Sequence, residues 1–583
     1  MKYQISTIIA LCGAAVFTSC EDMLSPESDM VTYQEDHTLK SANDTLYSVM
    51  GVVSLMQHVA DRTNLLGEVR GDLVNITSAA TTDLQELAAN MTSTSNVYNQ
   101  PKDYYAIINN CNYFIQYADM SKVRSGRKIF EREMAAMHTF RAWAYLQLAT
   151  TYGEVPFYTE FLGTQEDANL VLQQPRQNLQ TICNFLIEDL QPFITTYELD
   201  YGNMSAGSTV FQSHKFFIPV RVMLGELCLW SGRYQEAAQY YHDWLTDIDN
   251  PRTTEDYSCY WDRSDIPSQF LTSGSYNTSF LATSDQVITY IPMEENIFDG
   301  PISQLPNLYN STTDNYYYNQ LTYSEQVVQL SASQSYCYVY SENGIPKDTV
   351  YQSADSIVSK LNDRKQIGDV RLYAVLRESA LNQRDKRYND TYITFQKFLT
   401  SNERLRQVIL YRQPVIYLHY AEALNRAGFP TAAFAILKYG LSLETTQRTN
   451  GDVIDARERE SAGTLISFNN LTFNQKNTFG SHSRGCGDTY ADTLYVIPQP
   501  AAALASYADT VAFQQPLVED LIIEELGLET CFEGQRYYDL LRIAQRRGDA
   551  AYLADRIARR NGTVDEALRS RLMEPKNWYL PLP

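Results

Sequence analysis

Two groups of residues in this sequence are suited to holding a small polar ligand. Arg70 and Asp72 lie two positions apart in the segment 65–75, and their side chains can form hydrogen bonds with hydroxyl or peptide groups. A structural ion pair is an equally good interpretation of these two residues. The aromatic candidates lie near the centre of the chain and are Tyr260, Trp261, Tyr316, Tyr317, Tyr318, Tyr336, Tyr338 and Tyr340. Each could stack against a sugar ring or a peptide unit, although packing is the commoner role of a tyrosine.

The sequence offers little support for catalysis. It holds 69 acidic residues but only 7 histidines, and it has no HExxH zinc motif, no GxSxG motif and no phosphate-binding loop. A pair of carboxylates that hydrolyses a glycoside is recognised by its separation in space, so sequence alone does not exclude one. We therefore predict that the protein is not an enzyme, with a hydrolase as the remaining alternative.

Cys20 is the one residue for which we predict covalent chemistry. In residues 1–20, MKYQISTIIALCGAAVFTSC, a short basic start precedes a mostly apolar stretch that is too short to span a membrane comfortably. Small residues then lead to Cys20. This order is typical of a bacterial lipoprotein signal, so we predict that residues 1–19 are removed and that lipid is attached to Cys20. A plain secretory signal with an incidental cysteine is the alternative.

The acidic composition excludes one class of partner. The formal net charge is −22, from 47 basic and 69 acidic residues. Nucleic-acid binding needs a basic footprint, so we predict no nucleic-acid partner. The same charge opposes adhesion to an anionic membrane, so we expect membrane contact only through the lipid anchor.

The remaining cysteines and the acidic clusters predict no cofactor. Seven scattered cysteines follow Cys20 without a CxxC pair, so the usual zinc and thioredoxin-like signatures are absent. Most should be small buried residues, although an odd number leaves at least one unpaired or bonded to another molecule. Bound calcium is an alternative, because residues 247–249 and 262–265 bring oxygens together. Neither segment has the glycine and final glutamate of a calcium loop, so solvated surface charge is favoured.

Apolar residues at helical spacing predict a mainly α fold built from helix pairs like those of tetratricopeptide repeats. Glycine and proline separate the helices, as at Gly232 and at Gly428 and Pro430. The pairs are predicted at 104–120 with 131–152, at 179–197 with 214–247, within 415–440, and within 517–546. Long inserts between the pairs exclude a simple solenoid.

The stretch 249–402 differs from the rest of the chain. It is rich in Ser, Thr, Asn, Tyr, Gly and Pro, and the alternating tyrosines at 336–340 favour a strand. We predict one mature body, residues 20–583, in which a helical scaffold at about 40–248 and 403–583 carries this irregular, partly β insert. Long inserts on a scaffold commonly carry function.

A charge network is predicted near the end of the chain. The segment FEGQRYYDLLR, residues 532–542, places Glu533, Arg536, Asp539 and Arg542 among apolar residues. We predict that they are buried and pin the last helices, which is a structural role.

Five segments resemble motifs of the SusD/RagB family of outer-membrane lipoproteins. They are TFRAWAYLQLATTYGEVPFYTE (139–160), SGRYQEAAQYYHDWL (231–245), YLHYAEALNRAG (417–428), IIEELGLETCFEGQRYYDLLR (522–542) and NWYLPLP (577–583). They occur in the family's order and span nearly the whole mature chain. The sequence departs from the family pattern at Glu524 and Glu525, and the usual NxVR segment is not recognisable.

The resemblance implies a helical, SusD-like surface protein. Members of this family sit on the cell surface, lipid-anchored in the outer membrane, as a lid on a TonB-dependent, SusC-like barrel. They capture oligosaccharides or, in the RagB branch, oligopeptides for the barrel and break no bond. The sequence does not distinguish these two ligands. The alternative is a structural or adhesive surface lipoprotein that binds another protein.

Overall fold

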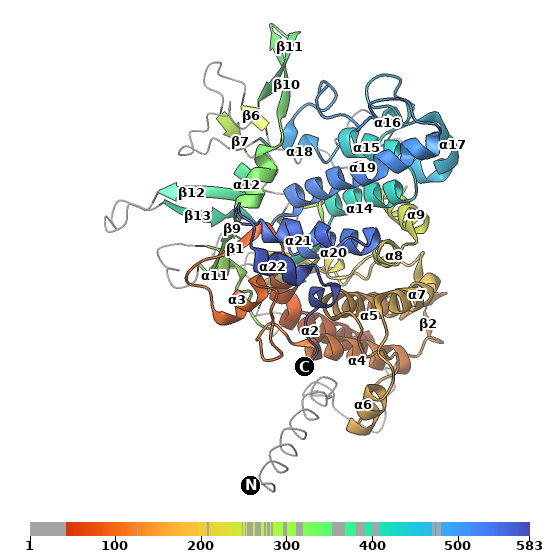
Figure 1. Ribbon diagram of the computed structural model, residues 1–583. Coiled ribbons are helices and arrows are strands. Elements are labelled where there is room, and N and C mark those ends of the chain that lie inside the picture. The colour runs from red at the N-terminus through yellow and green to blue at the C-terminus, as the bar shows by residue number, and fades with distance from the viewer. Residues whose placement is uncertain are drawn as a thin grey trace.

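The computed structural model is mainly helical, as the sequence predicts (Figure 1). It describes residues 42–124, 126–206, 209–247, 249–250, 252, 260–262, 270–272, 276, 280–281, 284–294, 300–310, 319–352, 368–380, 391–398, 407–468, 473 and 480–583. The predictions for Cys20, Tyr316, Tyr317 and Tyr318 lie outside these residues.

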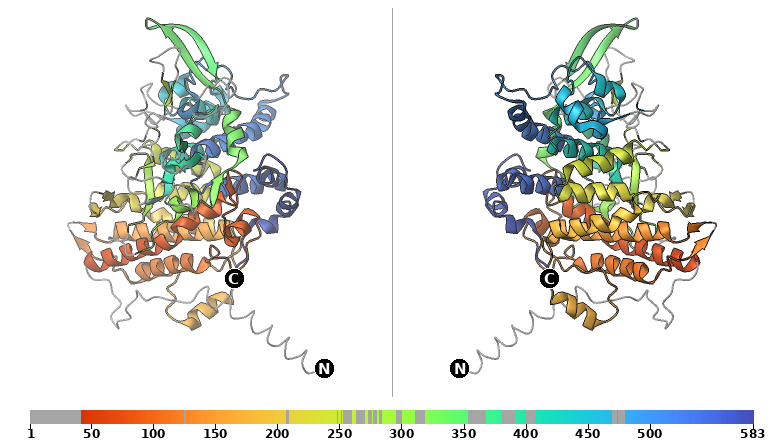
Figure 2. Two further views of the ribbon diagram at one scale, coloured as in Figure 1. Left: turned by 90° about the vertical axis from the view of Figure 1, so that its left-hand side faces the viewer. Right: turned by 90° about the vertical axis from the view of Figure 1, so that its right-hand side faces the viewer.

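Helices of the first half of the chain pack mainly on their neighbours in sequence. α4 packs on α5, α5 on α7, α7 on α8, and α8 on α9. Figure 2 shows these red to yellow helices stacked in layers in one part of the molecule. Their bounds are α2 Ala42–Glu68, α3 Thr82–Ala88, α4 Pro101–Tyr117, α5 Glu131–Tyr152, α6 Gln165–Leu172, α7 Leu179–Leu190, α8 Val220–Trp230 and α9 Tyr234–Leu245.

Helices of the second half continue the stack and return to its beginning. α14 packs on α9, α15 and α19, whereas α20 packs on α2 at the start of the chain. The bounds are α14 Gln413–Arg426, α15 Pro430–Tyr439, α16 Leu443–Gln447, α17 Ala456–Ala462, α18 Ser483–Cys486, α19 Tyr507–Thr530, α20 Arg536–Arg547, α21 Ala550–Ala558 and α22 Glu566–Leu572. The chain ends with the 3-10 helix η7, Pro575–Trp578, and an extended tail.

Glycine and proline separate the paired helices where the sequence predicts. Gly232 joins α8 to α9 with φ 78°, and Gly428 has φ 97° before Pro430 begins α15. A positive φ is inexpensive only for glycine, and proline fits the first turn of a helix because its missing N–H would have no partner there.

The described strands form two-stranded antiparallel ribbons and no larger sheet. The pairs are β1 (Val74–Ile76) with β9 (Leu321–Tyr323), β2 (Val123–Arg124) with β3 (Arg127–Lys128), β4 (Asn203–Ala206) with β5 (Thr209–Gln212), β6 (Tyr260–Asp262) with β7 (Phe270–Thr272), β8 (Val287–Pro292) with β14 (Gln407–Arg412), β10 (Tyr336–Glu342) with β11 (Ile345–Gln352), and β12 (Leu376–Ala380) with β13 (Thr391–Phe395). Short helices α11 Leu305–Tyr309, α12 Glu325–Ala332 and α13 Arg371–Val375 lie between them. The β10–β11 hairpin projects from the body at the top of Figure 1.

One hydrophobic cluster runs through the helical stack and joins both ends of the described chain. It includes Val49 of α2, Trp143 of α5, Leu424 of α14 and Leu580 of the tail. The tail is thus part of the core and helps to shape the surface around it. No helix in the described residues is long and apolar enough to cross a membrane.

Candidate ligand-binding cleft

A cleft of about 1270 Å³ lies where both ends of the scaffold meet. Its walls come from the end of α2, the loop after α3, the end of α5, the start of α7, the α8–α9 turn, α14, α20 and the tail. In Figure 1 the C-terminus lies beside α2 and below α20, which places the tail between early and late helices. The cleft is larger than a typical drug-sized pocket, so it has room for an extended ligand.

Arg70, at the inner end of the cleft, is 1% exposed. Its Nε donates to Oδ1 of Asn90 at 3.2 Å and its Nη2 to the carbonyl of Trp578 at 2.5 Å. Its guanidinium lies 3.8 Å from the ring centre of Tyr537. Arg70 therefore ties the loop after α3 to the tail through neutral partners.

Aromatic side chains on the cleft alternate with arginines. Trp230 and Tyr234 are half-buried at the α8–α9 turn. The guanidinium of Arg542 lies 5.2 Å from the Trp230 ring, and that of Arg426 lies 5.4 Å from the Tyr234 ring. These cation–π contacts hold the rings in place while part of each side chain remains exposed.

Buried carboxylates on the protein side of the cleft wall hold these arginines in place. Glu422 accepts hydrogen bonds from Arg542 at 2.7 and 3.0 Å and pairs with Arg426 at 2.6 Å. Glu519 pairs with Arg426 at 3.0 Å and with Arg546 at 3.2 Å. Burial alone would raise the pKa of Glu422, but Arg426 and Arg542 lower it to about 2. This wall of the cleft is therefore a network of ion pairs that is already in place before a ligand binds.

The tail forms the opposite wall and is held by the ends of two helices, α5 and α20. The Leu580 amide donates to the Thr151 carbonyl at 2.9 Å, and the Gln545 amide donates to the Tyr579 hydroxyl at 2.5 Å. The Tyr579 ring lies against Gly153, where an added Cβ would come within 3.2 Å of it. Gly153 also has φ 79° at the end of α5. The close approach of tail and helix thus depends on a glycine at this position.

The other sequence-predicted polar residue, Asp72, lies in the core and not in the cleft. It is fully buried, and its two carboxylate oxygens accept hydrogen bonds from Arg536 at 2.6 and 3.0 Å. Asp72 therefore forms a structural ion pair with Arg536. Arg70 and Asp72 are not paired with each other.

Tyr336, Tyr338 and Tyr340, the aromatic candidates of the insert whose side chains the structure describes, do not line this cleft. Tyr336 and Tyr338 on β10 are 2% and 8% exposed and belong to the core, and Tyr340 is partly buried against it. Tyr260 and Trp261 lie on strand β6. A ligand role for these tyrosines and for Trp261 stays a prediction.

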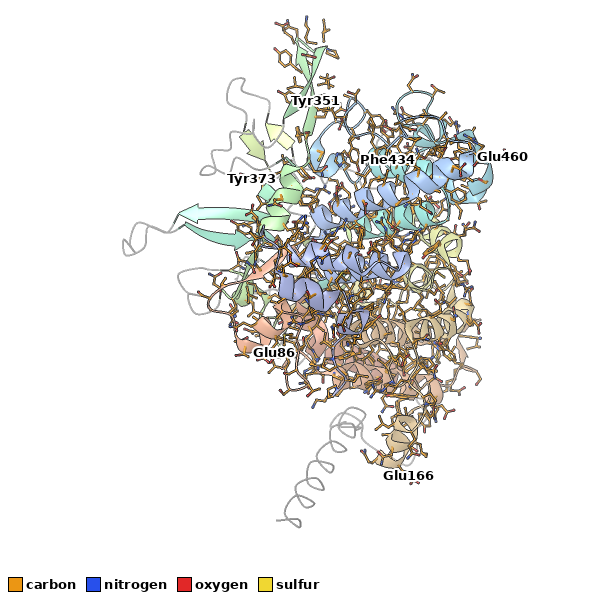
Figure 3. The ribbon with its side chains drawn as sticks, in the orientation of Figure 1. Glu86, Glu166, Tyr351, Tyr373, Phe434 and Glu460 are labelled. Atoms are coloured by element: carbon orange, nitrogen blue, oxygen red, sulfur yellow. The ribbon has the colours of Figure 1, made fainter. Side chains whose placement is uncertain are left out.

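The β10–β11 hairpin is tethered at its base. The Tyr351 hydroxyl, labelled in Figure 3, accepts the Thr493 amide hydrogen at 2.7 Å. The loop-rich stretch before α19 therefore braces the hairpin.

Sequence reasoning missed most of the cleft, although a signal was present. All five motif segments that carry the family resemblance contribute lining residues within their bounds. They supply Tyr152, Gly153 and Glu154, then Ser231, Gly232 and Tyr234, then Arg426, and finally Asn577, Tyr579, Leu580, Pro581 and Leu582. The fifth segment contributes Arg542 at its last position. The signal in the sequence was therefore that many of the lining residues fall within the motif segments.

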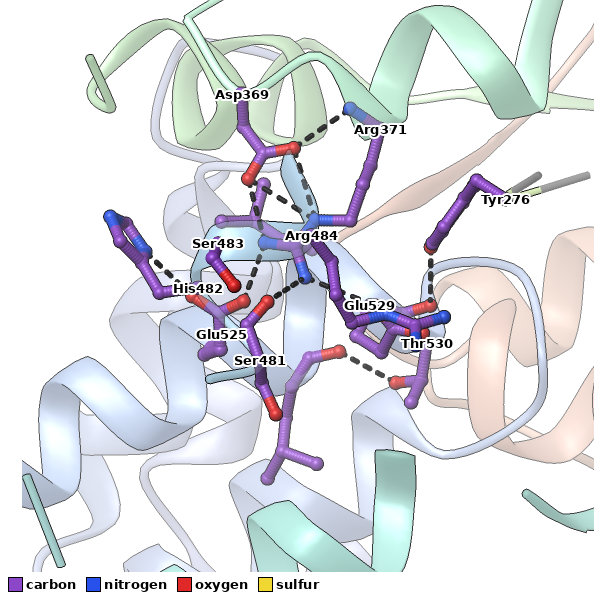
Figure 4. Close-up of polar contacts among 12 residues, drawn as sticks. Tyr276, Asp369, Arg371, Ser481, His482, Ser483, Arg484, Glu525, Glu529 and Thr530 are labelled. Carbon is purple, nitrogen blue, oxygen red and sulfur yellow. Dashed lines mark hydrogen bonds and ion pairs between the residues drawn. The ribbon is translucent and has the colours of Figure 1, made fainter. Parts of the chain in front are cut away.

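A second ionic cluster lies outside the cleft and holds the insert to the scaffold (Figure 4). Arg371 pairs with Asp369 at 2.6 Å, with Glu525 at 2.5 Å and with Glu529 at 3.0 Å. Arg412 and Arg484 also pair with Glu529, at 3.0 and 3.2 Å. Burial would raise the pKa of Glu529, but the three arginines lower it to about 2. All its charges are paired, so the cluster is structural.

The charge network predicted near the chain end is present and buried. Glu533 pairs with Arg412 at 2.7 Å and with Lys397 at 2.5 Å, and Arg542 pairs with Asp539 at 2.8 Å. Its partners come from the insert (Lys397), from β14 (Arg412) and from the loop after α2 (Asp72), as well as from the last helices. It therefore joins distant parts of the chain.

The structure offers no metal centre within the described ranges. No group of three or more His, Cys, Asp or Glu side chains there is placed to hold a metal ion. The six described cysteines, Cys111, Cys183, Cys228, Cys337, Cys486 and Cys531, are buried and free.

Comparison with solved structures identifies the fold. A SusD superfamily protein from Bacteroides vulgatus matches with a TM-score of 0.55 and 12% identity, covering 94% of this chain and 96% of that one. One from Bacteroides thetaiotaomicron matches with a TM-score of 0.53 and 15% identity over 86% and 89%. A SusD-like carbohydrate-binding protein from Bacteroides fragilis matches with 0.51 and 13% identity over 88% of each chain. No protein-family model and no curated sequence matches this chain. The SusD-like fold predicted from the motifs is confirmed.

Proposed function

We propose that this protein is a non-catalytic, cell-surface lipoprotein that captures oligosaccharides and passes them to a TonB-dependent outer-membrane barrel. The observation that carries the proposal is the SusD-like fold over most of the chain, shared with a structure known as a carbohydrate-binding protein. Fold alone does not set function, so the proposal also rests on the cleft.

The cleft has the groups that saccharide binding requires. Trp230, Tyr234 and Tyr579 are partly exposed aromatic side chains on its walls, and such rings pack against the apolar faces of sugars. Asn178 and Gln180 add exposed amides that can donate and accept hydrogen bonds with hydroxyl groups. A few fixed polar groups among aromatic side chains are the usual composition of a ligand site.

The anchor and the transporter partner come from the sequence. Residues 1–19 have the order of a lipoprotein signal, so the mature protein would be residues 20–583 with lipid on Cys20. The scaffold, about 40–248 and 403–583, would build the cleft, and the insert 249–402 would vary around it. The SusC-like barrel is the partner that the motif resemblance implies. An oligopeptide ligand and an adhesive role are the competing outcomes.

Native co-purification tests this function. A tag after Pro583 would sit next to the cleft, because Leu582 lines it. The tag is better inserted at Asn343–Gly344, in the exposed turn of the β10–β11 hairpin. We expect detergent extraction to yield a TonB-dependent barrel together with oligosaccharide, both identified by mass spectrometry. Recovery with peptides in place of sugar would change the ligand class, and recovery with unrelated surface proteins alone would contradict the proposal.

A further inference from the structure

The cleft is strongly basic although the protein is strongly acidic. Seven of its lining residues are cationic, namely Arg70, Arg176, Arg426, Arg542, Arg546, Arg571 and Lys576, and one, Glu154, is anionic. The chain as a whole carries a formal charge of −22. Binding of neutral sugars does not require this excess of cationic side chains, so saccharide capture alone does not explain it.

Four of these cations have carboxylate partners. Arg426, Arg542 and Arg546 form ion pairs with the buried carboxylates of Glu422 and Glu519. Lys576 pairs with Glu574 at 2.6 Å. Their charges are largely neutralised by carboxylates of the protein itself. They therefore contribute to the shape of the cleft more than to its positive potential.

The other three cations have no carboxylate within ion-pair distance in the described part of the chain. They are Arg70, Arg176 and Arg571. Arg176 is exposed, whereas Arg571 is half-buried and donates to the Ala89 carbonyl at 2.5 Å. They approach the cleft from the end of α2, from the loop before α7 and from α22.

Arg70 is the most informative of the three because it is almost completely buried. The side chain donates hydrogen bonds to the neutral Asn90 and Trp578, and its Nη1 has no hydrogen-bond partner among the residues that the structure describes. The Tyr537 ring, 3.8 Å from the guanidinium, offsets part of the cost of burying this charge but carries no full negative charge. An anionic group in the cleft would add the charge pairing that the described residues do not supply.

We propose that the cleft selects saccharides that carry carboxylate or sulfate groups, an inference that rests on the proposed function and names its substrate class. Guanidinium groups form paired hydrogen bonds with planar carboxylates and bind sulfate oxygens in a similar way. The acidic remainder of the surface repels such a chain, which confines binding to the cleft. Trp230 and Tyr234 would stack against the sugar rings between the charged groups.

Matched ligands that differ only in charge provide the test. Calorimetry on the mature, folded chain would compare hexagalacturonate with its fully methyl-esterified form, and a κ-carrageenan hexasaccharide, whose only charged groups are sulfates, with its desulfated, neutral form. We expect at least one anionic member to bind at least about tenfold more tightly than its neutral counterpart, with an affinity that falls as salt rises from 50 to 300 mM. The pair that shows the difference identifies carboxylate or sulfate as the preferred group.

Charge-matched variants locate the effect. Arg176→Glu should weaken binding of the anionic ligand about 5- to 10-fold, because it reverses a charge at the cleft without removing a described contact. Arg132→Glu is the control with the same change in net charge. Arg132 is exposed at the start of α5, whereas the cleft lies at the far end of that helix, roughly 30 Å away. The control should leave the affinity unchanged.

Two results would overturn the inference, and they are distinguishable. If the neutral members bind as tightly as the anionic ones and Arg176→Glu has no effect, the charge selection is wrong while saccharide capture stands. If neither kind of saccharide binds to folded protein that still co-purifies with peptides, the proposed function itself is wrong. Equal weakening by both variants would show that net charge, and not the cleft, governs binding.

Discussion

Arg536 holds both carboxylate oxygens of Asp72 across 464 positions of sequence, with Nε–Oδ1 and Nη2–Oδ2 distances of 2.6 and 3.0 Å. Both side chains are buried, at 3% and 0% exposure. The pair joins the loop after α2 to the first turn of α20. Asp72 is two positions after Arg70, which lines the cleft, so the pair also holds the backbone of this part of the cleft in place.

Removing one side of this pair should destabilise the whole protein. We expect Arg536→Ala to lower the free energy of unfolding by about 3–5 kcal/mol, because it leaves the Asp72 carboxylate buried and unpaired. Urea unfolding followed by circular dichroism would measure the loss. The control is Arg457→Ala, which breaks an exposed pair with Asp455 and should cost less than about 1 kcal/mol. Equal, small effects of both changes would contradict a structural role for the buried pair.

Gly153 tests whether the tail must approach α5 closely. Gly153→Ala should cost about 1–2 kcal/mol for the left-handed backbone and more for the contact of its Cβ with the Tyr579 ring. Gly202→Ala is the matched control, because Gly202 has φ 82° and open space around its Cβ position. The difference between the two in thermal unfolding isolates the contact. Identical losses would show that the tail is not held tightly against α5.

His419 should make stability fall at alkaline pH. It is buried between Glu226, at 2.7 Å, and Asp539, at 3.7 Å. Burial would lower its pKa, but these carboxylates raise it from 6.5 to about 9. Because the folded pKa is the higher one, the stabilisation is complete below pH 6.5 and is lost as pH rises through 9.

The corresponding measurement is the free energy of unfolding between pH 6 and pH 10. We expect it to fall by up to about 3 kcal/mol more in the natural protein than in His419→Gln, because the buried cysteines, whose pKa values are also raised, lower the stability of both proteins equally at high pH. A parallel pH dependence in both proteins would mean that His419 is not the group responsible.

The aromatic walls of the cleft should contribute to saccharide affinity. Trp230→Ala should weaken binding of any oligosaccharide that the protein retains by about tenfold or more, because it removes a stacking surface. Tyr340→Ala changes an aromatic residue of the projecting hairpin, outside the cleft, and serves as the comparison. Weakening by Tyr340→Ala alone would move the site to the insert, where the sequence first suggested it.

The helical scaffold was predictable because its signals are local. Gly153, Gly232, Gly428 and Pro430 end or begin helices where their backbone preferences require it. One boundary shows how local signals compete: the sequence suggested a helix from about 517, after Pro516, but α19 begins at Tyr507. A capping box between Ser506 and Asp509 starts it earlier, and Pro516 lies inside it.

The cleft was much less predictable because its parts meet only in the folded chain. Arg70 was identified from its type and position, but its partners Asn90 and Trp578 lie 20 and 508 positions away. The partner of Asp72 is equally remote. The alternate spacing of Tyr336 and Tyr338 predicted a strand with one aromatic face. Spacing alone does not show whether that face is exposed to solvent or packed against the core.

The most direct test of saccharide capture is a crystal structure of the protein with its tightest-binding oligosaccharide. We expect the sugar in the cleft between the α8–α9 turn and the tail, with a ring against Trp230 or Tyr234 and a charged group within reach of Arg70, Arg176 or Arg571. A sugar bound elsewhere, with this cleft empty, would contradict the account.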